Sequence, residues 1–314
     1  MTKYVFGPVP SRRLGKSLGI NNIPPKHCSY SCIYCQLGKT IHLEIERREF
    51  YEPNEIINEV CKVIATPHQK IDYITFVPDG EPTLDINLRN IAEKIKEVTD
   101  IPIAILTNAS LLWRNDVQDD LLIFDTVSLK IDAVHHDKWK LINRPHPKLV
   151  LDKILVGIED FSKKFEGRII TETMMIRNVN DDIAEIQAIA AFLSKLRIHK
   201  AYIAIPTRPP AEKWALPANE EVLLQAHEIF VRALGYEKVE LLTGYEGPDF
   251  GMIGDPIEAL LSIISVHPMR IDYARKFLEK AGLDSDSVIR KLLDEGKILK
   301  LNYNNQAFLM RKFL

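Results

Sequence analysis

Three cysteines in one short segment carry the clearest chemical information in this chain. Cys28, Cys32 and Cys35 lie in Cys-Ser-Tyr-Ser-Cys-Ile-Tyr-Cys, with three and then two residues between them. A cubane [4Fe–4S] cluster is normally held by four cysteine thiolates. A loop that offers only three predicts a cluster with one iron open to a small molecule, which is a site for redox catalysis.

A zinc site is the alternative interpretation of the same loop, with His27 or His42 as the fourth ligand. Zinc sites usually combine two closely spaced cysteines with two distant ligands, so three cysteines within eight residues favour the iron–sulfur cluster. The fourth cysteine, Cys61, falls in a predicted helix and is expected to be a small buried apolar residue.

The cysteine spacing, with Tyr34 just before the last cysteine, resembles the radical S-adenosylmethionine (SAM) superfamily. The resemblance implies a [4Fe–4S] cluster whose open iron is chelated by the amine and carboxylate of SAM. It implies that one electron breaks the S–C5′ bond and yields methionine and a 5′-deoxyadenosyl radical, which takes hydrogen from a substrate. A flavodoxin or ferredoxin-type protein is the expected electron donor, and Tyr34 is expected beside the adenine.

A second segment, Asp79-Gly80-Glu81-Pro82-Thr83, resembles the Gly-Gly-Glu motif that receives the amino group of SAM in this superfamily. Backbone carbonyls beside a glycine, together with the Glu81 carboxylate, are suitable acceptors for an ammonium group. Asp79 stands in place of the first glycine, which leaves open which side chain faces the ammonium. An ordinary turn is the alternative, because Asp-Gly and Glu-Pro are turn formers.

Polar residues near the ends of the third and fourth predicted strands resemble family segments that line the cofactor cleft. Ser128 and Lys130 alternate to one strand face, and Asp132 follows on it. The resemblance implies that Lys130 meets the SAM carboxylate, that Ser128 and Asp132 meet hydroxyls, and that Asn108 lines the same cleft. A helix N-cap is the alternative role for Asp132.

Four arginines in Gly- or Pro-rich loops are candidates for holding an anionic substrate. Arg12 and Arg13 precede the first predicted strand, Arg144 follows the fourth, and Arg208 follows the sixth. A guanidinium binds phosphate or carboxylate well. A solvated or structurally paired arginine is the alternative for each of them.

Short apolar runs alternate with helical patterns over the first 250 residues. Strands are predicted at 18–23, 71–77, 103–107, 124–131, 168–176 and 200–205, with one more at 239–242; helices are predicted at 55–65, 88–98, 116–122, 149–165, 182–196 and 219–234. Strands separated by helices indicate parallel βα units. We therefore expect an α/β fold, a partial (β/α)6 barrel over residues 1–250, with ligands at the carboxyl ends of its strands.

A Gly-rich break at 243–256 separates a smaller C-terminal part, residues 255–314. Helices are predicted at 257–265, 271–281 and 287–295. Two strands, at 297–303 and 306–313, are predicted to flank a two-residue hairpin turn at Asn304-Asn305. Three helices and a β-ribbon resemble a winged-helix domain. This part holds ten Lys or Arg against eight Asp or Glu, which is less basic than DNA-reading domains usually are.

Length and composition are compatible with one large unit and one small one. The chain has 314 residues, 46% of them hydrophobic, and a net charge of −2. The charge excludes a globally basic nucleic-acid binder. No apolar run is long enough for a membrane span and no signal peptide is visible, so a reducing cytoplasm is the expected location.

The motifs together resemble short radical SAM proteins related to the wyosine-base (tRNA imidazoguanosine) synthase group. Subgroups that need further cluster cysteines or reactive cysteines are disfavoured, because only Cys61 is spare. The expected function is a radical SAM enzyme acting on an unidentified substrate, with an RNA base or a protein as candidates. The alternatives are a glycyl-radical activase of a partner protein and an iron–sulfur sensor that binds DNA through the winged helix.

Overall fold

One curved eight-stranded sheet organises most of the chain, and its strand order is β1-β2-β5-β6-β7-β8-β9-β10. The computed structural model describes residues 4–66, 70–244 and 247–312. The strands are β1 (Val5–Ser11), β2 (Gly15–Ile20), β5 (Tyr73–Phe76), β6 (Ile103–Thr107), β7 (Thr126–Lys130), β8 (Arg168–Met174), β9 (Lys200–Ala204) and β10 (Val239–Leu242). From β2 to β10 every neighbouring pair is parallel, so the predicted parallel α/β sheet is confirmed.

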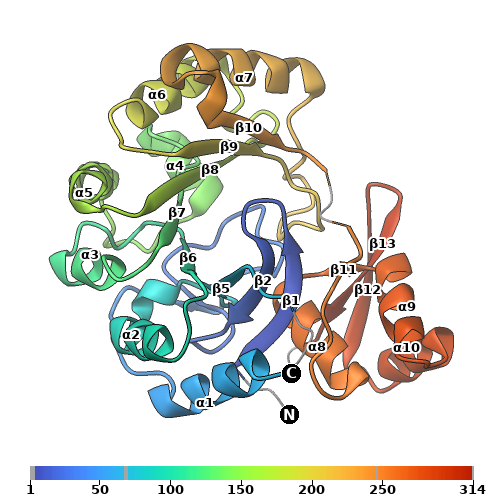
Figure 1. Ribbon diagram of the computed structural model, residues 1–314. Helices are drawn as coiled ribbons and strands as arrows, with labels where there is room; N and C mark the ends of the chain where they lie inside the picture. Colours follow the sequence, from blue (N-terminus) through green and yellow to red (C-terminus); the bar gives the residue numbers. More distant parts are fainter. Residues whose placement is uncertain (1–3, 67–69, 245–246, 313–314) are drawn as a thin grey trace.

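Helices cover the convex side of this sheet, while the concave side faces the middle of the molecule (Figure 1). They are α1 (Pro53–Ile64), α2 (Leu88–Val98), α3 (Asn115–Leu121), α4 (His136–Asn143), α5 (Leu151–Lys164), α6 (Ile183–Leu193) and α7 (Glu220–Leu234), with short 3-10 turns η1 (Pro82–Leu84) and η2 (Tyr236–Lys238). In α2, Leu88, Ile91 and Ile95 are fully buried at three- and four-residue steps, which is the face that packs on the sheet.

The first strand, β1, was not among the predicted elements. It pairs antiparallel with β2, and it stands at the edge of the sheet. Its sequence contains Pro8 and Pro10, which cannot donate backbone hydrogen bonds and are therefore confined to edge strands. The hairpin of β1 and β2 brings Ser11, Arg12 and Arg13 toward the concave side of the sheet.

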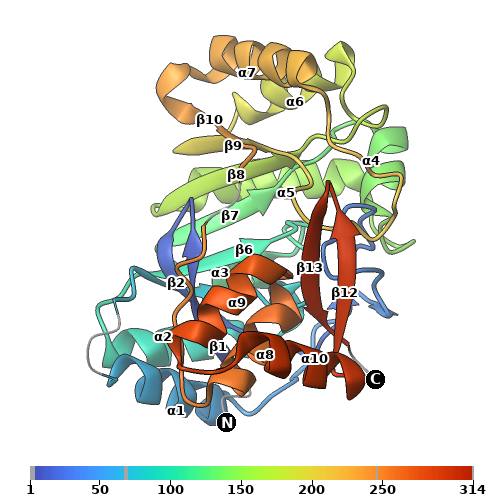
Figure 2. The ribbon, with the colours of Figure 1, turned by 90° about the vertical axis from the view of Figure 1, so that its right-hand side faces the viewer.

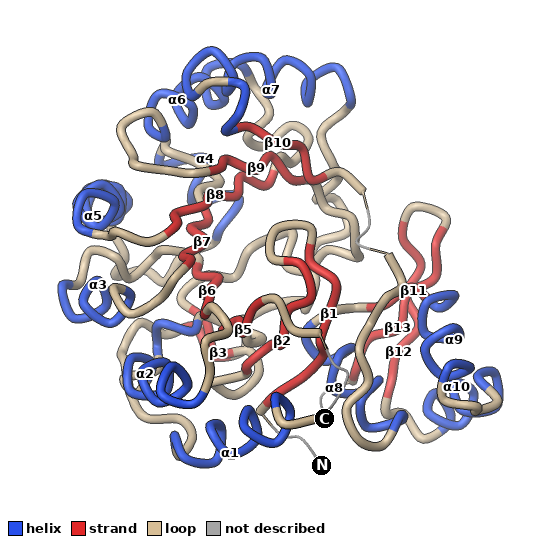
Figure 3. The backbone as a smooth tube through the Cα atoms, in the orientation of Figure 1, coloured by secondary structure: helices blue, strands red, loops and turns tan. Residues whose placement is uncertain are grey.

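The cysteine segment follows β2 and begins with β3 (His27–Cys28), which pairs in parallel with β4 (His42–Leu43). The two short strands bring the ends of the loop together. Figure 3 shows β3 beside β5 and β2, and His27 of β3 forms an isolated bridge with Gly80, which follows the end of β5.

The C-terminal part consists of α8 (Pro256–Val266), β11 (Met269–Arg270), α9 (Ile271–Lys280), α10 (Ser285–Asp294), β12 (Ile298–Tyr303) and β13 (Gln306–Arg311). Its strands form an antiparallel sheet of order β11-β13-β12. The predicted cap of the third helix is confirmed, because Asp284 Oδ1 accepts from the backbone N–H of Ser287 at 3.2 Å. Asn304 and Asn305 have φ of +45° and +58°, which suits a two-residue hairpin turn.

The C-terminal elements pack against the β1 edge of the large sheet (Figure 2). Phe6 and Val9 of β1 share one apolar cluster with Leu260 and Ile264 of α8. The remaining sheet strands and their helices form a separate, larger cluster. The β1 edge is thereby covered by apolar side chains, and the end of α8 reaches the concave side of the sheet.

Candidate functional site

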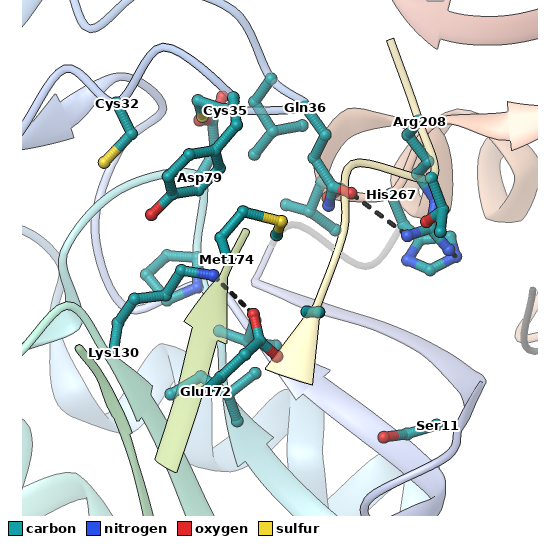
Figure 4. A pocket seen from close by; sticks show the side chains of 18 of the residues that line it. Ser11, Cys32, Cys35, Gln36, Asp79, Lys130, Glu172, Met174, Arg208 and His267 are labelled. Carbon is teal, nitrogen blue, oxygen red and sulfur yellow. Dashed lines mark hydrogen bonds and ion pairs between the residues drawn. The ribbon is translucent and has the colours of Figure 1, made fainter. Parts of the chain in front are cut away.

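A cavity of about 360 Å³ opens at the carboxyl ends of the parallel strands (Figure 4). The loops after β2, β5 and β9 line it, together with the last residues of β7, β8 and β10. Val266 and His267, at the end of α8, complete the wall. Cys28, Cys32 and Cys35 all face this cavity, so the predicted ligand loop lies where the fold was expected to bind ligands.

The backbone of the cysteine loop is held from both sides. Cys35 donates its N–H to the Cys32 carbonyl at 3.1 Å, which closes a turn between these two cysteines. Ile33 donates to the carbonyl of Ile142 at 3.0 Å, which attaches the loop to the end of α4. The loop is therefore positioned by a neighbouring βα unit and not only by its own sequence.

Two amide side chains donate toward the cysteine sulfurs. Asn108 Nδ2 lies 3.5 Å from Cys28 Sγ and also donates to Ser29 Oγ at 2.9 Å. Asn143 Nδ2 lies 3.5 Å from Cys32 Sγ and donates to Asp132 Oδ2 at 2.8 Å. Such N–H···S contacts to cluster ligands tune reduction potential. Asn108 was predicted in the cleft, whereas Asn143 was not singled out, although it directly precedes the candidate Arg144.

Burial raises the pKa of all three ligand thiols. After burial, the largest cause of the raised pKa is the charge of Glu81 for Cys28 and the charge of Asp132 for Cys32. The pKa of Cys32 is raised to about 12. Burial also dominates at Cys35, followed by the charge of Asp79. Thiolates in this position need positive charge beside them, which cluster iron supplies. The donor set thus fits an iron–sulfur cluster.

Glu81 lies beneath the cavity wall, and it is not one of the cavity-lining residues. Its Oε1 accepts from the Thr83 and Thr107 hydroxyls, each at 2.6 Å, and its Oε2 accepts from the backbone N–H of Asn108 at 2.7 Å. The carboxylate therefore ties the turn after β5 to the end of β6. Gly80 does line the cavity, and a Cβ there would come within 2.0 Å of the His27 carbonyl oxygen, so the close approach of the cysteine loop requires glycine.

Asp79 lines the cavity and pairs with Lys26, a residue that the sequence did not single out. Lys26 Nζ lies 3.3 Å from Asp79 Oδ2, and both side chains are buried. Burial raises the pKa of Asp79 to about 6, although the charge of Lys26 opposes the shift. Of the three residues in the Asp-Gly-Glu motif, Asp79 is the one whose carboxylate faces the cavity.

Lys130, Glu172 and Arg13 form a charged group on the cavity floor. The Glu172 carboxylate at β8 accepts from both Lys130 Nζ and Arg13 NH1, and all three residues line the cavity. The adjacent cations hold the pKa of Glu172 down, at about 2, against its burial. Lys130 Nζ also lies 4.8 Å from the ring centroid of Tyr34, which lines the cavity as well.

Ser128 and Asp132 are buried but are not among the cavity-lining residues. Asp132 accepts from the Tyr34 hydroxyl through Oδ2 and from the backbone N–H of Met174 through Oδ1, the latter at 2.9 Å. Asp132 therefore holds Tyr34 in place from behind the wall. The geometry favours a positioning role for Asp132 over direct contact with a ligand.

Three of the four candidate arginines, Arg12, Arg13 and Arg208, line the cavity. Arg144 is not one of the lining residues; it pairs with Glu212 at 2.6 Å. Arg208 NH2 lies 2.8 Å from His267 Nε2, and its NH1 lies 3.3 Å from Gln36 Oε1.

The two histidines considered as zinc ligands, His27 and His42, contact other side chains instead. The His27 ring contacts Glu44 through Nδ1 and stacks on His42 with centroids 4.1 Å apart. Both histidine rings are thus engaged with each other, and His27 also with Glu44. These contacts do not support the zinc interpretation.

Comparison with known proteins places these features in a family. The model of the Radical SAM superfamily matches residues 22–192, and the chain belongs to this superfamily. Within it, the chain is 48% identical over 307 residues to the UPF0026 protein MJ1312 of Methanocaldococcus jannaschii, covering 98% of this chain and 95% of that one. A UPF0026 protein of Helicobacter pylori is 33% identical and is covered over 88% of both chains.

A solved structure of TYW1 with a lysine-pyruvate adduct bound has a similar fold. The TM-score is 0.53 at 15% identity, covering 69% of this chain and 73% of that one. The protein is thus a radical SAM enzyme whose cofactors are a [4Fe–4S] cluster and SAM, and Cys28, Cys32 and Cys35 are the residues present to hold the cluster. Within the described residues, no helix is long and apolar enough to cross a membrane.

Proposed function

We propose that the protein cleaves SAM reductively and uses the resulting 5′-deoxyadenosyl radical to abstract hydrogen from a substrate bound in the same cavity. The observation that carries the proposal is that the three cysteines, Asp79 and Lys130 all line one cavity at the carboxyl ends of the strands. When bound and reduced, the cluster supplies the electron that breaks the S–C5′ bond of SAM. The electron itself comes from a flavodoxin or ferredoxin-type partner.

The chain's own residues bind and orient SAM in this proposal. Asp79 accepts the methionine ammonium, because its carboxylate faces the cavity whereas Glu81 is held by four hydrogen-bond donors below it. Lys130 carries positive charge toward the methionine carboxylate, and Tyr34 packs beside the adenine. Ser128, Glu81, Asn108 and Asp132 position these groups from behind the wall.

We also propose that the chain has two units, a partial (β/α)6 barrel over residues 1–250 and a winged-helix domain over residues 255–314. The order α8-β11-α9-α10-β12-β13 and the antiparallel sheet support the second assignment. The apolar cluster shared with β1 supports docking of the second unit onto the barrel rather than free movement.

An RNA base is the substrate that the motif resemblance favours, and a protein is the alternative. A DNA-binding sensor would not use the Asp79, Lys130 and Tyr34 wall, so the cavity supports the enzyme over the sensor. A glycyl-radical activase differs from an RNA modifier in its substrate, because it acts on the polypeptide backbone of a partner protein and not on a nucleic acid.

The test is anaerobic reconstitution with iron and sulfide, followed by dithionite and SAM, with 5′-deoxyadenosine measured by chromatography. The wild type is expected to form it, and Cys32→Ala is expected to lose both the cluster and the product. Cys61→Ala is the matched control and should keep both, since Cys61 lies on α1 and packs against the core. Product formation by Cys32→Ala, or a wild type that binds no iron, would contradict the proposal.

A further inference from the structure

The third cluster ligand, Cys35, is held differently from the other two. Side-chain amides donate toward the sulfurs of Cys28 and Cys32. At Cys35, burial is the main cause of the raised pKa, and a hydrogen bond from the backbone N–H of Leu37 opposes the rise. The donor to the third thiol is therefore a main-chain group of the ligand loop itself.

Gln36 stands between this donor and the ligand. The carbonyl of Gln36 and the N–H of Leu37 belong to one planar peptide group, so the conformation of Gln36 sets the direction of that N–H. The Cys35 carbonyl accepts from the N–H of Gly38 at 3.1 Å, which closes a turn around Gln36. A contact that fixes Gln36 therefore also fixes the donor to the Cys35 thiol.

The side chain of Gln36 is held at both ends of its amide. Its Nε2 donates to the Val266 carbonyl at 3.1 Å, and its Oε1 accepts from Arg208 NH1 at 3.3 Å. Figure 4 shows Gln36 between Cys35 and Arg208. Because one end of an amide donates and the other accepts, these two contacts fix its orientation.

The end of α8 explains why Gln36 finds these partners. Val266 is the last residue of α8, and the last four carbonyls of a helix have no donor within the helix. Val266 is buried, so its carbonyl needs a donor from another segment, which Gln36 supplies. Just beyond the helix, the Pro268 carbonyl accepts from Arg208 Nε at 3.2 Å. The ligand loop and the end of α8 thus satisfy each other's polar groups.

The loop that carries Arg208 is itself attached to the C-terminal part. The Tyr303 hydroxyl, at the end of β12, donates to the Pro206 carbonyl at 3.0 Å. Arg208 NH2 lies 2.8 Å from His267 Nε2. The C-terminal part therefore reaches Gln36 by two routes, directly from α8 and through Arg208.

We propose that Gln36 is the positioning residue of the third cluster ligand, Cys35, and that the C-terminal part acts on the cluster through it. The barrel orients the donors to the first two sulfurs, whereas the C-terminal part orients the donor to the third. The reduced cluster carries more negative charge than the oxidised one, so an N–H donor to its sulfur stabilises it more and raises the reduction potential. The proposal rests on the proposed function only for the use of the cluster in SAM cleavage.

An EPR-monitored redox titration of the reconstituted protein without SAM tests this role. Gln36→Leu keeps the size of the side chain and removes both hydrogen bonds, so its cluster potential should be more negative than that of the wild type. An iron chelator should also remove its cluster about tenfold faster, since two hydrogen bonds of ordinary net strength correspond to about this factor. Gln187→Leu is the matched control and should behave as wild type, because Gln187 is exposed on α6.

A second variant acts on the same group from a distance. Tyr303→Phe removes the hydroxyl that donates to Pro206 and leaves the ligand loop untouched. It should shift the potential in the same direction by a smaller amount, and the chelator should remove the cluster about threefold faster. Tyr236→Phe is its control, since Tyr236 is 72% exposed on η2.

A wild-type potential in Gln36→Leu would overturn the proposal. A lower melting temperature with an unchanged potential would do the same, because it would show a contact that stabilises the fold and does not position the ligand. Where Gln36→Leu fails to fold, a wild-type potential in Tyr303→Phe would overturn it. If the potentials shift as expected but the wild type forms no 5′-deoxyadenosine, the proposed function fails and the role of Gln36 stands.

Discussion

Glu172 is the residue whose removal should reveal how the charged cavity is stabilised. Its carboxylate is the shared partner of Arg13 and Lys130, and its side chain is only 13% exposed. Replacing Glu172 with Gln keeps the shape and removes the charge, leaving two cations close together in a buried place. Breaking a buried ion pair from one side typically costs about 3–5 kcal/mol, whereas an exposed ion pair contributes only about 0–1 kcal/mol.

The pKa of Glu172 gives an independent magnitude for the same interaction. The pKa is lowered from 4.5 to about 2, and each pH unit corresponds to about 1.4 kcal/mol, so the ionised carboxylate contributes about 3 kcal/mol. Because the folded-state pKa is the lower one, this contribution is fully present above pH 4.5 and is lost as the pH falls toward 2. The Glu172→Gln variant should therefore lose about 3 kcal/mol at pH 7, and its deficit should shrink in acid.

Urea unfolding of the cluster-free protein under thiol reductant measures this difference, at pH 7 and at steps down to pH 3. Glu159→Gln is the matched control, since Glu159 forms an exposed helix-surface pair with Lys163, and its removal should leave the free energy of unfolding close to that of the wild type. Arg13→Gln should cost less than Glu172→Gln, because the Lys130 pair remains. A Glu172→Gln deficit under 1 kcal/mol at pH 7, or one that does not narrow in acid, would refute the reasoning.

Three further predictions concern the walls of the cavity. Asp79→Asn should lower SAM affinity about tenfold at pH 8. The wild-type affinity should fall as the pH drops through about 6, because Asp79 then takes up a proton and loses its charge. Calorimetry across pH 5.5–8 checks both results, and a wild-type affinity that does not change with pH counts against the ammonium role of Asp79. Asn143→Ala should make the reduction potential of the cluster more negative, because it removes an N–H donor to the Cys32 sulfur. An EPR-monitored redox titration measures this potential. An unchanged or higher potential would contradict the role of Asn143 as a donor to the cluster ligand. Glu81→Gln should cost about 1–3 kcal/mol in thermal unfolding, because an amide N–H₂ would face donors that now bind a carboxylate; an unchanged melting temperature would show that the network relaxes.

Much of the sheet could be predicted because its elements are encoded locally. The helix at 88–98 and the strand at 103–107 have the bounds that the sequence predicted, since their apolar residues repeat with clear periods and turn residues flank them. β1 escaped prediction because Gly7, Pro8 and Pro10 interrupt its pattern. Its strand character comes from pairing with β2, which the residues of β1 alone do not specify.

The candidate site was predictable in its ligand loop and less so in its walls. The cysteines lie on one loop, so their spacing alone brings them to one place. Whether Asp79 or Glu81 faces the cavity depends on Thr107 and Asn108 at the end of the next strand, which bind Glu81 from below. Lys26 and Glu172 were missed for the same reason, because their charge partners lie on other elements.

The cavity depends on the C-terminal part more than the family match suggests. The superfamily model ends at residue 192, yet Gln36, next to the ligand Cys35, donates to the Val266 carbonyl at 3.1 Å. Cutting the chain after residue 250 would remove this contact together with His267, and it would expose Phe6 and Val9 of β1. The M. jannaschii relative aligns over 98% of this chain, so it matches the C-terminal part as well as the barrel. The end of α8 is therefore best regarded as part of the site, because the Val266 carbonyl accepts from the residue after a cluster ligand and His267 contacts Arg208 of the cavity wall.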